Sequence, residues 1–263
     1  MIIKQVSCKT ALNPSKLPDT TYALNPYRGC QHNCIYCYVP SVIRIDRKLW
    51  GTFVEVKRNL PLVLSKEIKN KKRGIIGIST VTDPYQPVEE EYRVTRYCLK
   101  VLINHDFPIW IQTKSSLVKR DVSIISSLKD AEVMLSIGTL DEEERRILEP
   151  CSSSINDRLN TLRFLSDRGV KTSVFFGPIY PTIEVEDLPY IIDVFKDTGV
   201  SYIMIDRFHM KPGLWDYMSS KLELYPKLHR VFSEKLFSDY YNKLRKHIFR
   251  IGEERGIKIV DAF

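Results

Sequence analysis

The sequence has no long hydrophobic run. None of its 263 residues belongs to an uncharged stretch near the length of about 20 residues that a helix needs to cross a bilayer. The opening segment, Met1 to Ser7, lacks the long apolar core of a secretory signal. Repeats, low-complexity segments and recognisable linkers are also absent. We therefore expect a soluble, cytoplasmic protein with one main core and no membrane partner.

Cysteine is scarce and unevenly spread. The chain has six cysteines at irregular spacing, which fits a reducing compartment and a metal site better than a disulfide framework. Cys30, Cys34 and Cys37 form a C-x3-C-x2-C array on one short segment. Three thiolates leave a four-position iron–sulfur cube one ligand short. The array therefore predicts a [4Fe–4S] cluster with one iron open to a substrate or cofactor.

A structural zinc site is the main alternative for this segment. His32 stands between the first two cysteines and could complete a tetrahedral set of ligands. Zinc knuckles divide their ligands into two separated halves, whereas here all the candidates crowd into one loop and no second half follows. The spacing favours the cluster over zinc.

The array and its surroundings resemble the radical S-adenosylmethionine (SAM) enzymes. Tyr36 provides the aromatic residue before the third cysteine, and the flanking Asn25–Gly29 and Tyr36–Tyr38 are similar to the spore photoproduct lyase-like branch. Further motifs of that branch recur in order between Tyr22 and Ile192: Thr82–Glu89, Ile111–Ser115, Arg120–Asp121, Leu148–Pro150 and Arg158–Leu159. The resemblance implies a partial (β/α)6 barrel, a [4Fe–4S] cluster, SAM, and an electron donor such as flavodoxin or ferredoxin.

The resemblance also implies roles for single residues. Cys30, Cys34 and Cys37 would bind the cluster. The residues expected to bind the cofactor are Tyr36, Tyr38, Thr82, Lys114, Ser136 and Ile179.

Within this set, Tyr36 would line the adenine, and Thr82 and Lys114 would hydrogen-bond the polar parts of SAM. Ser136 would reach a ribose hydroxyl. Simpler alternatives are loop packing for Tyr36, a solvated ammonium for Lys114 and a turn cap for Ser136.

Ile179 belongs to a segment, Gly177–Glu184, that is similar to the fifth-strand adenine motif of the family. Pro181 stands where a second glycine is common, so the segment departs from the family pattern there. Asp83, Tyr85 and Gln86 are candidates to face the substrate. Glu149 and Arg158 are expected to form a structural ion pair.

One cysteine of spore photoproduct lyase has no counterpart in this sequence. Spore photoproduct lyase carries a cysteine near the end of its second strand that returns a hydrogen atom to the repaired thymine. The matching segment here, Ser79–Asp83, contains none, so the sequence does not predict cleavage of spore photoproduct. Cys151, in a loop expected on the active face, is a candidate hydrogen donor or ligand of a second cluster; the alternative is that it has no role.

Positive charge is concentrated near the end of the chain. The net charge is +8, and the segment from Arg207 to Lys258 contains twelve Lys and Arg residues but only six Asp and Glu residues. A basic face attracts phosphate backbones, which makes nucleic acid a candidate substrate, while lysine-rich solvated helices are the alternative. The resemblance implies a radical SAM enzyme that takes hydrogen from an unknown substrate, and the charge makes nucleic acid a candidate beside a smaller molecule or peptide. The competing class is a non-catalytic nucleic-acid-binding protein with a structural metal loop.

Short β-branched runs alternate with amphipathic stretches, which is typical of βα units around a parallel sheet. The expected strands are Thr21–Leu24, Gly74–Ser79, Pro108–Thr113, Val133–Gly138, Lys171–Gly177 and Tyr202–Asp206. The expected helices are Pro61–Lys72, Glu89–Asn104, Lys119–Lys129, Glu142–Leu148, Ile155–Arg168 and Val185–Thr198, followed by largely helical sequence from Tyr217 to Arg255 and a strand-like tail at Ile257–Val260.

The predicted fold class is therefore α/β, a partial (β/α)6 TIM-like barrel with a C-terminal helical extension. We expect an N-terminal extension at 1–20, the barrel at 21–206 and the helical extension at 207–263, packed on the barrel. Functional residues of such barrels gather at the carboxyl ends of the strands. Five polar segments fall at the ends of the first five predicted strands: Asn25–Tyr38, Ser79–Asp83, Thr113–Ser115, Ser136–Thr139 and Gly177–Tyr180.

Overall fold

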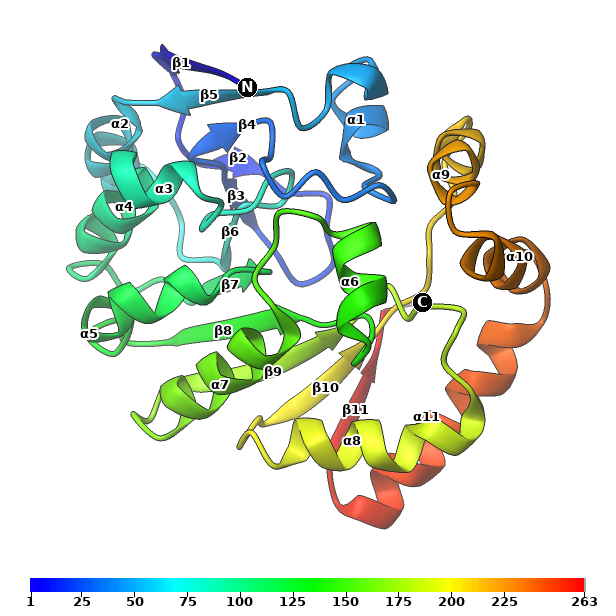
Figure 1. Ribbon diagram of the computed structural model, residues 1–263. Helices are drawn as coiled ribbons and strands as arrows, with labels where there is room; N and C mark the ends of the chain where they lie inside the picture. Colours follow the sequence, from blue (N-terminus) through cyan, green and yellow to red (C-terminus); the bar gives the residue numbers. More distant parts are fainter. Residues whose placement is uncertain (263) are drawn as a thin grey trace.

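An eight-stranded sheet, in the order β11-β10-β9-β8-β7-β6-β3-β2, organises the computed structural model, which describes residues 1–262 (Figure 1). The six strands predicted from the sequence all form: β3 (Tyr22–Leu24), β6 (Ile76–Ile78), β7 (Ile109–Thr113), β8 (Ala131–Ser136), β9 (Lys171–Phe176) and β10 (Tyr202–Ile205). Each pairs in parallel with the next along the chain. Parallel pairing brings their carboxyl ends to one edge, which confirms the partial barrel.

Two further strands extend this sheet. The tail predicted to be strand-like becomes β11 (Lys258–Asp261), which pairs in parallel with β10. At the opposite edge, β2 (Asn13–Pro14) pairs antiparallel with β3. β2 and β11 therefore stand at opposite ends of the sheet, so the barrel stays open between them.

Helices cover the outer side of the sheet, as the alternation of strands and amphipathic stretches predicted (Figure 1). They are α2 (Leu60–Glu67), α4 (Val94–Leu102), α5 (Val122–Ile125), α7 (Ile155–Ser166), α8 (Leu188–Lys196) and α11 (Tyr240–Arg255), with α6 (Glu142–Leu148) near the carboxyl ends of the strands. In α4 the buried residues Val94, Cys98 and Leu102 recur every four positions and face the core. Cys98 is thus a small core residue.

The helix predicted over Glu89–Asn104 is interrupted. The structure divides it into α3 (Val88–Tyr92) and α4, with Arg93 between them in the left-handed conformation (φ 54°). The cause is the buried carboxylate of Glu89, which accepts hydrogen bonds from the backbone N–H groups of Thr95 and Arg96 at 2.9 and 3.1 Å. These donors would otherwise be unsatisfied at the start of α4.

Short 3-10 turns replace helix at several predicted ends. They are η2 (Ile68–Asn70) after α2, η3 (Ser116–Asp121) before α5 and η4 (Val185–Asp187) before α8. Such tightened turns are frequent at helix termini, so the predicted helices exist but are shorter than their patterns suggested.

A small second sheet, not foreseen from the sequence, lies beside the barrel. Its order is β1-β5-β4, formed by β1 (Ile2–Val6), β5 (Phe53–Lys57) and β4 (Tyr27–Arg28). β1 pairs in parallel with β5. The segment that carries Cys30, Cys34 and Cys37, here called the cysteine segment, follows β4 in the chain. It is followed by α1 (Val39–Val42), η1 (Arg47–Leu49) and then β5.

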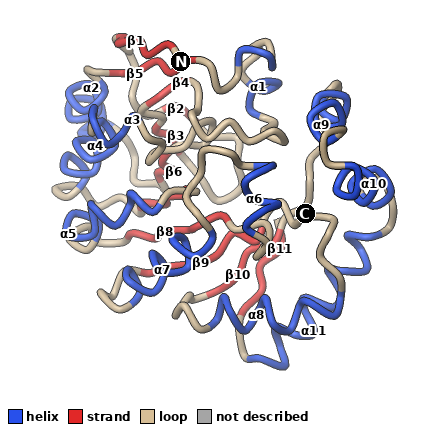
Figure 2. The backbone as a smooth tube through the Cα atoms, in the orientation of Figure 1, coloured by secondary structure: helices blue, strands red, loops and turns tan. Residues whose placement is uncertain are grey.

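The C-terminal region forms α9 (Leu214–Leu222), α10 (Pro226–Lys235) and α11 before the chain returns to the sheet as β11 (Figure 2). Phe232 packs edge-on against Tyr180 and Phe208, with ring centroids 6.2 and 5.6 Å apart. The Tyr241 hydroxyl donates to the carbonyl of Ile179 at 3.0 Å. These aromatic residues therefore serve packing, and no helix within residues 1–262 is long and apolar enough to cross a membrane.

Candidate active site

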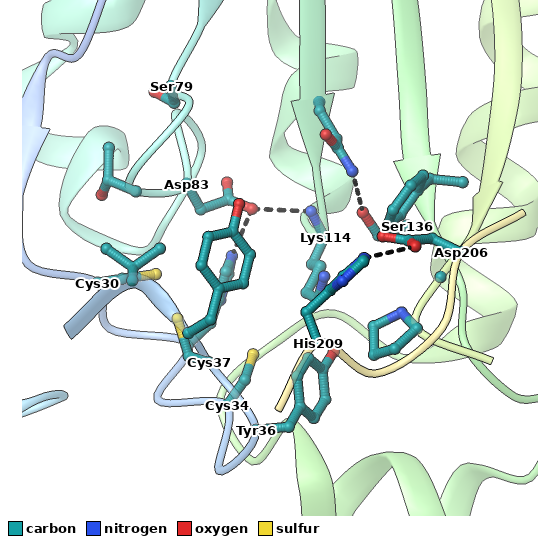
Figure 3. A pocket seen from close by; sticks show the side chains of 18 of the residues that line it. Cys30, Cys34, Tyr36, Cys37, Ser79, Asp83, Lys114, Ser136, Asp206 and His209 are labelled. Carbon is teal, nitrogen blue, oxygen red and sulfur yellow. Dashed lines mark hydrogen bonds and ion pairs between the residues drawn. The ribbon is translucent and has the colours of Figure 1, made fainter. Parts of the chain in front are cut away.

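A pocket lies at the carboxyl ends of the parallel strands, between them and the cysteine segment (Figure 3). The ends of β6, β7, β8, β9 and β10 all contribute to its wall. Of the residues given a role from the sequence, the structure brings these to the wall: Cys30, Cys34, Tyr36, Cys37, Tyr38, Thr82, Lys114 and Ser136. Residues far apart in the chain thus share one cavity because parallel pairing aligns the ends of their strands.

The three thiols lie together on one side of the pocket (Figure 3). Cys30 and Cys34 are buried, with 8% and 9% of their surface exposed, and Cys37 is partly buried. The N–H of Cys37 donates to the carbonyl of Cys34 at 3.1 Å, which closes the turn between them. The segment therefore presents its three thiols to one space.

Gly29 fixes where the cysteine segment begins. Its φ is +91°, and a Cβ at this position would lie 2.3 Å from the carbonyl oxygen of Phe53, so only glycine fits. The Gly29 carbonyl accepts hydrogen bonds from Thr82 Oγ1 at 2.6 Å and from Gln86 Nε2 at 3.3 Å. Thr82, which was expected to bind SAM, thus also anchors the segment next to Cys30.

Further contacts tie the segment to the barrel and to η1. The N–H of Ile35 donates to the carbonyl of Leu148 at 3.0 Å. The Arg47 guanidinium donates to the carbonyl of Cys37 at 2.5 Å. Because both sides of the segment are held, its thiols are positioned before any ligand binds.

The chemistry of these thiols suits a bound iron–sulfur group. Burial raises the pKa of all three cysteines, Cys30, Cys34 and Cys37. Buried thiols stay protonated and inert unless a positive metal stabilises the thiolate. Beside them, the indole N–H of Trp50 is buried and donates no hydrogen bond to any part of the chain that the structure describes. A site with three thiols and an unused donor fits a sulfur-rich cofactor.

The structure does not favour the zinc alternative. His32 Nδ1 lies 3.0 Å from the carbonyl oxygen of Cys151, and Nε2 lies 3.2 Å from Asp83 Oδ2. Both ring nitrogens thus face oxygen partners. Across residues 1–262, no three His, Cys, Asp or Glu side chains meet closely enough to hold a single metal ion. Because both of its ring nitrogens face oxygen atoms, His32 is not oriented to complete a tetrahedral zinc site with the three cysteines.

Glu149 is the centre of a buried charge network beneath the cysteine segment. It pairs with Arg158, and each side chain is only 1% exposed, which confirms the predicted ion pair. Tyr36 donates its hydroxyl hydrogen bond to Glu149, and Lys114 Nζ lies 3.9 Å from Oε1. Burial by itself raises the pKa of Glu149, but the charges of Arg158 and Lys114 and the bond from Tyr36 lower the pKa to about 2. The carboxylate therefore stays ionised at neutral pH.

Lys114 and Ser136 face the pocket from neighbouring strand ends (Figure 3). The Lys114 ammonium lies 5.9 Å from the centroid of the Tyr36 ring. Glu149 pairs more closely with Arg158 than with Lys114, so the positive charge of Lys114 is available to attract an anionic ligand. Ser136 Oγ accepts a hydrogen bond from Gln112 Nε2 at 3.2 Å, so its own hydroxyl hydrogen can still be donated.

Asp83 lines the pocket, but its carboxylate oxygens already interact with other residues of the protein. Its carboxylate accepts from Thr113 Oγ1 at 2.7 Å and from the Lys114 N–H at 2.8 Å, besides facing His32. Burial alone raises the pKa of Asp83, and these partners together lower the pKa to about 2. Asp83 thus joins the ends of β6 and β7.

Other residues singled out in the sequence do not reach the pocket. Ile179 is fully buried; its N–H donates to the carbonyl of Asp206 at 2.9 Å, and the pocket wall beside it is made by Gly177 and Pro178. Tyr85 and Gln86 are also fully buried outside the wall. Cys151 is exposed and outside the wall, although its backbone exchanges hydrogen bonds with His32.

The structure adds residues that sequence reasoning missed. Asp206 and His209 follow β10 and face the thiols across the pocket (Figure 3), with Nε2 of the histidine 2.8 Å from Oδ1 of the aspartate. Gln112 and Trp50 also line the wall. An Asp-x-x-His that begins at the last residue of a predicted strand was the available signal for the pair, whereas nothing in the sequence placed Trp50 near the cysteines.

Comparison with known families gives one match that spans most of the chain. The model of the Radical SAM superfamily matches residues 24–205. An uncharacterized protein of Methanocaldococcus jannaschii is 33% identical over 236 residues, which cover 89% of this chain and 87% of that protein. The radical SAM Nalpha-GlyT isomerase of Pseudomonas phage M6 is 24% identical over 206 residues, 72% of this chain and 42% of that protein.

Among solved structures, the fold is similar to that of spore photoproduct lyase complexed with dinucleoside spore photoproduct. The TM-score is 0.75 at 14% sequence identity, and the match covers 99% of this chain and 82% of that chain. At this identity the likeness establishes the fold.

Proposed function

The chain belongs to the radical SAM superfamily, and from that premise we propose that Cys30, Cys34 and Cys37 hold a [4Fe–4S] cluster at which SAM is cleaved. The observation that carries the proposal is the pocket itself, where three buried thiols face polar side chains from neighbouring strand ends. Family membership makes the chain an enzyme that uses SAM and an iron–sulfur cluster, and it removes support for a non-catalytic binding protein.

When bound, the cluster and SAM supply one-electron reductive cleavage to methionine and a 5′-deoxyadenosyl radical, which abstracts a hydrogen atom from the substrate. The task of the protein is to hold and orient. The cysteine segment fixes three ligand positions through the contacts of Gly29 and Arg47.

We assign the remaining roles from the groups that stay free to bind. The Lys114 ammonium suits the carboxylate of SAM, and the Ser136 hydroxyl suits a ribose hydroxyl. Tyr36 is fixed by its bond to Glu149 and by edge-on packing against Phe208, with centroids 5.3 Å apart, so its ring can offer a rigid face to the adenine. Thr82 and Tyr38 line the same wall. Ile179 would contribute only through its neighbours, because its own backbone groups bond within the protein.

Anaerobic reconstitution tests the proposal. The purified chain should take up iron and sulfide, and with dithionite and SAM it should release 5′-deoxyadenosine and methionine. The electron paramagnetic resonance spectrum of the reduced cluster should change when SAM is added. Binding of iron and sulfide without any 5′-deoxyadenosine would refute SAM cleavage, and a folded preparation that takes only zinc would refute the cluster.

For the substrate we propose a phosphate-bearing molecule, with nucleic acid as the class to test first. Arg207 lines the pocket, and Arg47 and Lys221 both lie over the ring of Tyr217, at 5.6 and 5.8 Å. The solved structure of spore photoproduct lyase complexed with dinucleoside spore photoproduct supports a substrate that contains nucleosides, although that ligand gives no support for the phosphate itself. The positive charge of the C-terminal region supports nucleic-acid binding less strongly than the sequence suggested, because several of its cations pair with carboxylates. These cations are Arg230, Lys235, Arg245, Arg250 and Arg255.

Salt should weaken binding of a DNA oligonucleotide measured by fluorescence anisotropy. Each phosphate contact adds about −0.9 to the slope of log affinity against log salt, so three contacts predict a loss of about 40-fold between about 50 and 200 mM salt. Arg207→Gln should reduce that slope by about 1. Arg250→Gln is the matched control, since its guanidinium pairs with Glu254 on α11. An affinity that salt leaves unchanged would favour an uncharged small molecule or peptide.

A further inference from the structure

Trp50 has a buried hydrogen-bond donor with no acceptor. Its side chain is 4% exposed, and Nε1 donates to no atom of the described residues. A tryptophan N–H is a donor only, and leaving it unpaired in a protein interior costs stability. Buried tryptophans usually find a partner. The unused N–H of Trp50 therefore calls for an explanation.

Two of the cysteines are among the nonpolar neighbours of Trp50. Trp50, Cys30 and Val39 form a small buried cluster of their own, against which Cys37, Ile43 and Val81 pack. Valine and isoleucine side chains accept no hydrogen bonds. Within this cluster the side-chain atoms able to accept one are the sulfurs of Cys30 and Cys37.

Trp50 is also held in place rather than loosely buried. Its backbone N–H donates to the carbonyl of Arg47 at 3.0 Å, and Arg47 in turn donates to the carbonyl of Cys37. The indole lines the same pocket as the thiols. Arg47 of η1 thus bonds to the backbone of both Trp50 and Cys37, which fixes these two residues relative to each other.

We propose that Trp50 is a positioning residue whose indole N–H donates a hydrogen bond to the sulfur of the bound cluster, at the Cys37 thiolate or a sulfide next to it. The inference rests on the proposed function, since it needs the cluster. Hydrogen bonds to the sulfurs raise the reduction potential of iron–sulfur clusters, because the reduced cluster carries more negative charge. Trp50 would thus ease the reduction that SAM cleavage requires.

The test is the midpoint potential of the reconstituted cluster, followed by electron paramagnetic resonance without SAM. Trp50→Phe keeps an apolar aromatic ring and removes the N–H. Loss of one hydrogen bond to a charged acceptor should change the reduction equilibrium by about tenfold, and for a one-electron couple this moves the potential to a more negative value by about 59 mV. Trp215→Phe is the matched control: Trp215 lies on α9, stacks on His229 and is not part of the pocket wall.

Each outcome decides a separate point. If Trp50→Phe holds as much iron and sulfide as the unchanged protein and has the same potential, the inference is wrong while the proposed function stands. If the unchanged protein takes up no iron and sulfide, the proposed function itself fails. If Trp50→Phe does not fold, 3-benzothienylalanine at position 50 replaces it, because this analogue keeps the shape of indole and has sulfur in place of N–H. An unchanged potential in that protein overturns the inference, and a more negative one supports it.

Discussion

Cys34→Ala should lower the iron and sulfide content of the reconstituted protein to background and bring 5′-deoxyadenosine below detection. The same is expected of Cys30→Ala and Cys37→Ala. All three thiols line one pocket, and no further cysteine lines it among residues 1–262, so no other thiol there can replace the lost ligand. Iron and sulfide assays, with quantification of 5′-deoxyadenosine after dithionite and SAM, measure the effect.

Cys8→Ala is the matched control for these variants. Cys8 is partly buried, and the hydrogen bonds it makes to Asn59 come from its backbone, so alanine keeps them. The control should retain the iron content and SAM cleavage of the unchanged protein. A Cys34→Ala protein with full iron content would contradict the assignment of the ligands.

Arg158→Met should lower the free energy of unfolding by about 3–5 kcal/mol, because it leaves the carboxylate of Glu149 buried without its main partner. Both side chains are 1% exposed, and the next cation, Lys114, lies 3.9 Å away. Arg158 also donates to the carbonyls of Ser136 and Ser153, at 2.7 and 3.0 Å. Urea denaturation followed by circular dichroism measures the loss.

The comparison variant is Arg250→Met. Arg250 is exposed and pairs with Glu254 on the surface of α11, so its loss should cost no more than about 1 kcal/mol. The double variant Glu149→Gln with Arg158→Met should recover part of the stability, since no buried charge then lacks a partner. An Arg158→Met protein as stable as the Arg250→Met protein would show that the pair is not the structural centre proposed here.

The parallel strands were predictable because their signal is local. Runs such as Ile109–Thr113 and Lys171–Phe176 are rich in apolar and β-branched residues, and each is followed by a helix pattern. The order of the strands along the chain then fixes a parallel sheet, since right-handed crossovers place each strand beside the last. The same reasoning predicts from the sequence that Cys30, Lys114 and Ser136 lie at one edge of the sheet.

The elements that escaped prediction depend on distant partners. β1 (Ile2–Val6) is exposed over most of its length and is a strand because β5 pairs with it. The break at Arg93 depends on where the Glu89 carboxylate is buried. Ile179 follows β9 as the motif suggested, but its backbone is bonded to Asp206 and Tyr241. In each case the competing interaction comes from a residue that sequence spacing alone does not bring near.

The sequence alone determined the cofactor chemistry and the barrel, because a cysteine array and an alternation of strand and helix patterns are properties of neighbouring residues. The tertiary structure decided what surrounds the thiols. Only the folded chain brings Trp50 against Cys30 and Cys37, sets Glu149 between Tyr36 and Arg158, and turns His209 toward the pocket on Asp206. These contacts join segments whose closeness depends on the packing of the whole chain, and burial gives them their strength by removing water from the charges and donors involved.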